Sequence, residues 1–99
     1  MNSRHLEEYI KKNPDKKPAL QGLLDVSKIR EDAFNAIANV VTSPDARNAI
    51  VQQFVNATNA ANNADEAMEA LEGLIDIQSD NTAKLQYDRI LEKMQSYGH

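Results

Sequence analysis

The sequence predicts an all-α fold, a small bundle of four or five helices. Apolar residues recur at steps of three and four along most of the 99-residue chain, which is the spacing of one helix face. The chain lacks sustained alternation of branched or aromatic residues, and it lacks the Asn-Gly and Asp-Gly pairs that form hairpin turns. With 41% hydrophobic and 26% charged residues, the composition is typical of a folded protein. We therefore expect residues 1–99 to form a single helical domain.

Residues 1–17 are predicted to form a short helix and a linker that contains proline and lysine. Three apolar residues share one face of a helix expected over residues 4–12: Leu6, Tyr9 and Ile10. The following segment, NPDKKP, is expected to be a turn or linker, because each proline forces the residue before it out of helical geometry. So short a helix is stable only when it docks on another element, and residues 18–99 are predicted to form the bundle core.

A helical stripe of apolar residues comes next: Leu20, Leu23, Leu24, Val26, Ile29, Ala33, Phe34, Ile37, Val40 and Val41. Its weak points are Gly22 and the stretch DVSKIRED, where Ser27 could cap a new helix with Glu31 in its first turns. The pattern is compatible with one kinked helix and with two shorter ones.

The segment TSPDARNAI predicts the start of the next helix. Ser43 is a suitable N-cap, Pro44 suits the first helical position, and Asp45 complements the positive end of the helix dipole. The core-facing positions of this helix are expected to be Ile50, Val51, Phe54, Ala57 and Ala61.

The segment NATNAANNADEA is predicted to contain the end of that helix and the start of another. Alanine is the best helix former, whereas asparagine is poor inside a helix and good as a cap. Asn63 followed by Glu66 matches a variant of the capping box, so we place a helix end near Asn62 and a new start at Asn63. An unbroken helix over residues 44–97 would be about 80 Å long, far longer than a domain of this size is wide.

The last segment shows two apolar stripes that differ in phase. The first contains Met68, Leu71, Leu74 and Ile75, with the polar Gln78 at the next position of the same face, and the second contains Ala83, Tyr87, Ile90, Leu91, Met94 and Tyr97. The phase changes at the sequence SDN, where Ser79, Asp80 or Asn81 could cap a final helix. Because no proline or glycine stands there, a bent continuous helix is the alternative.

Charge is distributed unevenly along the chain, whose formal net charge is -4. Residues 1–17 carry five basic and three acidic side chains, a net charge of +2, whereas residues 18–99 carry six basic and twelve acidic side chains, a net charge of -6. Five carboxylates recur at helical spacing in a region without any basic residue: Asp65, Glu69, Glu72, Asp76 and Asp80. We interpret them as an acidic face, which is either a solvated surface or a docking site for a basic partner.

Residue types that build active sites are scarce. The chain contains no cysteine, and its two histidines, His5 and His99, lie at opposite ends, so we expect no metal site, no cofactor and no enzymatic activity. The segment DIQSDNTAKLQYD fails as a calcium loop, because Asn81 replaces the glycine and Tyr87 replaces the bidentate acid.

The segment Ile37–Ile50 has the helix, turn and helix order of DNA-reading motifs. Arg47 would lie in the first turn of the second helix, and Asn48 and Gln52 would offer amides to read bases. No other basic residue stands between Arg30 and Lys84, although phosphate binding requires clustered cations. We therefore expect a plain helical hairpin, and nucleic-acid binding by a regulator is the least favoured alternative.

The Gln-, Asn- and Ala-rich helices that end in LIDIQSDNTAKLQYDRILEKM resemble, in general composition, helical subunits of bacterial secretion and phage assemblies. This resemblance implies a structural subunit of a larger assembly and assigns no role to any residue. Ahead of it we expect a non-enzymatic protein–protein interaction module, such as an adaptor, regulator, chaperone or inhibitor. Its expected partner is another protein with a basic surface, with homo-oligomerisation as the alternative. Without a long apolar run or an apolar leader, the chain is expected to be cytoplasmic and not to enter a membrane.

Overall fold

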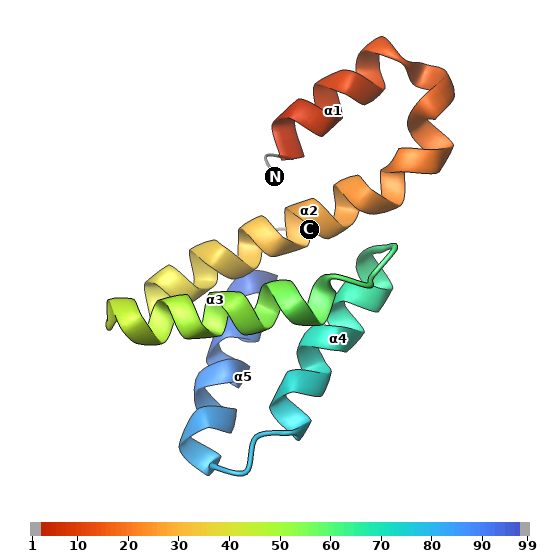
Figure 1. The fold of residues 1–99 in the computed structure, drawn as a ribbon. Coiled ribbons are helices and arrows are strands. Elements are labelled where there is room, and N and C mark those ends of the chain that lie inside the picture. Colours follow the sequence, from red (N-terminus) through yellow and green to blue (C-terminus); the bar gives the residue numbers. More distant parts are fainter. Residues whose placement is uncertain (1–2, 98–99) are drawn as a thin grey trace.

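The structure, a computed structural model, describes residues 3–97, so His99 lies outside the described residues. This part of the chain contains five α-helices, one short 3-10 helix and no strand (Figure 1): α1 (Ser3–Lys12), η1 (Pro14–Lys16), α2 (Lys17–Val40), α3 (Pro44–Thr58), α4 (Ala64–Asp76) and α5 (Asn81–Gln95). The predicted all-α bundle is confirmed.

Helix α2 is a single helix of 24 residues, about 36 Å long. It passes through Gly22 and Ser27 without a break, so the alternative of two shorter helices is wrong. Pro18 lies in its first turn, where a missing N–H costs no hydrogen bond. Ser27 is buried in the middle of the helix and caps nothing.

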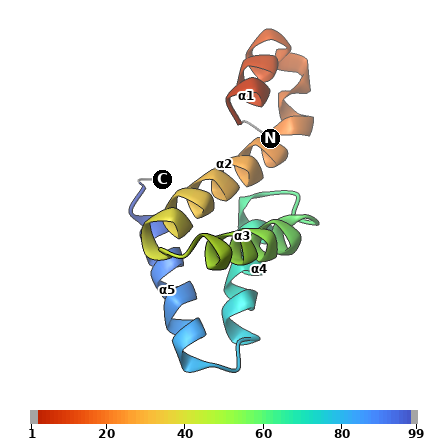
Figure 2. The same ribbon diagram turned by 60° about the vertical axis from the view of Figure 1, so that its left-hand side comes forward.

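The two sides of α2 carry different neighbours. Helix α1 folds back along the N-terminal half of α2 and, among the described helices, contacts only α2 and η1. Helices α3, α4 and α5 pack on the opposite side of α2 (Figures 1 and 2). The molecule is consequently elongated, with extents of 46 × 23 × 22 Å.

Three predicted helix starts are confirmed by side-chain caps. The Ser43 hydroxyl accepts from the N–H of Ala46 at 3.5 Å, and the Asn63 side chain accepts from the N–H of Glu66 at 2.9 Å. The Asp80 carboxylate accepts from the N–H of Thr82 at 2.9 Å. The break at SDN is therefore real, and α4 and α5 are separate helices.

The end of α3 differs from the prediction, because the helix stops at Thr58 rather than near Asn62. The Arg30 guanidinium donates to the Thr58 hydroxyl at 2.9 Å and to its carbonyl at 3.1 Å. The helix itself leaves this carbonyl free, and it accepts both from Arg30 and from the N–H of Ala61, at 3.1 Å. Ala61, expected on the core face of the helix, lies instead in the loop and is half-buried.

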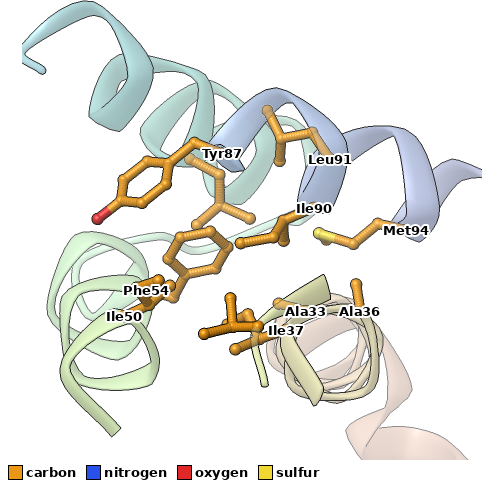
Figure 3. Packing of buried hydrophobic residues seen from close by; sticks show 11 residues of the cluster. Ala33, Ala36, Ile37, Ile50, Phe54, Tyr87, Ile90, Leu91 and Met94 are labelled. Carbon is orange, nitrogen blue, oxygen red and sulfur yellow. The ribbon is translucent and has the colours of Figure 1, made fainter. Parts of the chain in front are cut away.

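The core is formed mainly by α2, α3 and α5, with Leu71 contributed by α4 (Figure 3). Phe54 is only 2% exposed, and its ring meets Tyr87 edge to face at a centroid distance of 5.8 Å and an angle of 82°. The Tyr87 hydroxyl donates to the side-chain oxygen of Gln53. Ala33 and Ala36 are fully covered, and their small side chains let α2 approach its neighbours closely.

At Gly22 the backbone of another segment lies close against α2. A Cβ atom at this position would overlap the carbonyl oxygen of Asn62, in the loop between α3 and α4, and would lie 3.3 Å from its carbonyl carbon. The obstructing atoms belong to backbone and cannot rotate away. Gly73, inside α4, has no atom within 4 Å of the equivalent position.

We therefore expect alanine at the two helical glycines to change stability in opposite directions. Gly73→Ala should raise the free energy of unfolding by about 0.5–1 kcal/mol through helix propensity. Gly22→Ala should lower it by about 1–3 kcal/mol because the loop must move. Urea denaturation of both variants provides the measurement, and stabilisation by Gly22→Ala would contradict the close packing of the loop.

Replacement of Phe54 by alanine should cost about 3–5 kcal/mol of stability, as expected for a buried aromatic side chain. The chain's other phenylalanine, Phe34, is 36% exposed and provides a matched control, since Phe34→Ala should cost clearly less. Equal losses in thermal or urea unfolding would show that the core is not centred on Phe54.

Burial raises the pKa of the Tyr87 phenol above its ordinary value of 10.0. Above pH 10 the unfolded chain therefore loses this proton before the folded protein does, and stability should fall as the pH rises. Tyr87→Phe should reduce the fall in the free energy of unfolding above pH 10. Below pH 10 the free energy of unfolding of the variant should depend on pH as that of the unaltered protein does. Identical alkaline profiles for the two proteins would contradict the assignment.

Candidate protein interaction surface

Four of the five predicted acidic residues form one exposed stripe along α4. Asp65, Glu69, Glu72 and Asp76 follow one another at steps of four, three and four, and all are exposed. Asp80 lies beyond the end of α4 and caps α5, so it belongs to the turn and not to the stripe. We call the four residues on α4 the acidic stripe.

Among residues 3–97, no basic side chain forms an ion pair with the acidic stripe. The ion pairs described within residues 3–97 are Arg4–Glu8 and Lys28–Glu7, on α1 and α2, and none involves a carboxylate of α4. Unpaired like charges on one surface create a negative potential that attracts cationic ligands from solution. The stripe is therefore a source of long-range attraction, although charge alone does not define a binding site.

A groove of about 430 Å³ lies beside the acidic stripe, between α2, α4 and α5. Its lining residues are Asp25, Lys28, Ile29, Asp32, Ala64, Met68, Met94 and Gln95. The apolar lining includes one residue from each helix, Ile29, Met68 and Met94. Methionine side chains adapt readily to the shape of what they contact, so this groove can receive apolar groups of various shapes.

Carboxylates border the groove on two sides. On α4, Asp65 and Glu72 lie three positions before and four positions after Met68, which makes them its neighbours on the helix surface. On α2, Asp25 and Asp32 line the groove itself. The result is an apolar groove between two groups of negative charges.

The one cation in the groove lining, Lys28, is directed toward α1. Its ammonium group lies 3.4 Å from the Glu7 carboxylate. This ion pair reduces the positive charge that Lys28 presents to the groove, so the rim remains predominantly acidic.

The possible DNA-reading hairpin uses its arginine for its own structure. The Arg47 side chain donates to the carbonyls of Val41 and Thr42, at 2.7 and 3.1 Å. It thereby holds the turn between α2 and α3 together. An arginine engaged in this way is poorly placed to contact phosphate or bases.

No family model, curated protein or solved structure matches this chain. Within residues 3–97 no helix is both long and apolar enough to span a bilayer. The same residues contain no group of three or more acidic or histidine side chains arranged to hold a metal ion.

The acidic stripe follows from sequence periodicity, whereas the groove does not. Its apolar residues come from helices separated by tens of positions in the chain, and their meeting depends on how those helices pack. One signal was present in the sequence: Met68 and Met94, the only methionines after Met1, both line the groove.

Proposed function

We propose that this protein is a non-enzymatic interaction module that binds a partner protein with a basic, amphipathic surface. The observation that carries the proposal is the apolar groove with Ile29, Met68 and Met94 in its lining and carboxylates on both sides. The absence of enzymatic activity and the cytoplasmic location remain expectations from the sequence.

The partner's chemistry follows from the two components of the site. Apolar side chains would enter the groove, as in complexes where an amphipathic helix lies between helices of its receptor. Lysine or arginine side chains beside them would face the acidic stripe and the α2 carboxylates. Such complementarity mainly accelerates association and excludes acidic partners.

A synthetic amphipathic peptide of leucine and lysine provides a direct test. We expect the protein to bind it, with an affinity that falls as salt is raised. Glu72→Lys, which changes the acidic stripe next to Met68, should weaken binding by about three- to tenfold. Fluorescence anisotropy of the labelled peptide is the measurement.

Asp15→Lys is the matched control, because Asp15 is exposed in η1, an element that supplies no residue of the groove lining, and the substitution changes the net charge by the same amount. It should leave peptide binding nearly unchanged. Equal weakening by the two variants would mean that the peptide responds to overall charge only, and no binding by the unaltered protein would overturn the proposal.

A further inference from the structure

Polar contacts fix the register of the antiparallel hairpin that α1 forms with the first half of α2. The backbone N–H and the hydroxyl of Ser3 donate to the two carboxylate oxygens of Glu31, at 2.9 and 2.8 Å. Further along, the Lys28 ammonium pairs with Glu7 at 3.4 Å. These contacts identify the positions at which each helix faces the other.

One side of this hairpin is apolar. Four residues that face the space between the helices are Glu7, Ile10, Gln21 and Leu24. The residue before each of them is apolar: Leu6, Tyr9, Leu20 and Leu23. Two antiparallel helices are related by an approximate two-fold axis normal to their common plane, so these four preceding residues lie on the same side. We call them the hairpin flank.

The hairpin flank is open to solvent and bordered by basic residues. Tyr9 is 48% exposed and Leu23 is 49% exposed. Lys12 follows Tyr9 by three positions on α1, next to it on the helix surface. Lys16, exposed in η1, lies four positions before Leu20, next to it on the same face. An apolar surface with a basic border is the chemical complement of the acidic groove.

The hairpin flank and the groove lie on opposite sides of α2. At about 100° per residue, the helix positions of Leu20 and Leu23 are centred about 180° away from those of Asp25, Ile29 and Asp32. Because α2 is one continuous helix, a chain cannot bring its own flank into its own groove.

We propose that the groove receives the hairpin flank of a second copy of this chain. Tyr9 and Leu23 of one copy contact the apolar lining of the other, and Lys12 and Lys16 beside them face the carboxylates of α2 and α4. This inference rests on the proposed function, because it names the basic amphipathic partner of the same site.

The contact is head-to-tail, since it joins two different surfaces. Each added copy leaves a free groove at one end and a free flank at the other, so association continues unless the rotation closes a ring. The average mass in sedimentation velocity should therefore rise with protein concentration. It should fall when salt is raised from about 20 mM to about 500 mM, which screens the charges.

Two variants test the hairpin flank and the groove one at a time. The flank variant, Tyr9→Gln with Leu23→Gln, keeps its groove, and the groove variant, Glu69→Lys with Glu72→Lys, keeps its flank. Each alone should show a dissociation constant for self-association raised by more than about tenfold. An equimolar mixture should form a 1:1 dimer that does not grow, because each variant supplies the surface that the other lacks.

Leu85→Gln is the control for removal of an exposed leucine, since Leu85 is 54% exposed on α5, and it should associate as the unaltered chain does. An equimolar mixture of the flank and groove variants that remains monomeric would overturn the inference. A groove variant that still dimerises by itself would also overturn it, because that result would indicate contact between two hairpin flanks. A chain that stays monomeric at about 1 mM would have a dissociation constant for self-association above that concentration. Association so weak would overturn the inference. The proposed function still stands in that case if the leucine and lysine peptide binds.

Discussion

The carbonyl group of Asn62 lies against the backbone of α2 at Gly22, and this contact fixes where α4 begins. The next residue, Asn63, caps α4, so the position of the loop also sets the position of the first turn of that helix. Ala64 and Met68, on the first turns of α4, line the groove together with residues of α2. A single position without a side chain therefore controls both the packing of the bundle and the shape of its candidate binding site.

Features that depend on neighbouring residues were predictable from the sequence. Ser43, Asn63 and Asp80 cap helices through atoms two or three positions away, so their sequence context contains the necessary information. The end of α3 at Thr58 is also held by Arg30, which is 28 positions earlier in the chain, and the sequence around Thr58 gives no sign of that contact. Around Ser27 the continuous helix α2 is also buried, with Val26 2% and Ser27 7% exposed, and burial of this kind is not evident from neighbouring residues alone.

The candidate binding site also combines a feature that the sequence predicts with features that depend on how the helices pack. Helical periodicity places four carboxylates on one stripe of α4, and the structure shows them exposed. The spacing of the carboxylates also grouped Asp80 with them, although the change of phase at SDN had already indicated that Asp80 could instead cap a final helix. The groove arises only when α2, α4 and α5 pack, and the hairpin flank arises only when α1 folds back. Neither surface exists on one helix alone.

Among the described helices, α1 contacts only α2 and η1. Its contacts with α2 include the hydrogen bonds from Ser3 to Glu31 and the partly exposed ion pair of Lys28 with Glu7, and Ile10 is its buried apolar side chain. Segments with so few contacts open at a lower free energy than that of global unfolding. The amide hydrogens of α1 should accordingly exchange with solvent before those of the helices around Phe54. A molecule seated on the hairpin flank stabilises the closed form by mass action, so the exchange rate of α1 reports the occupancy of that surface.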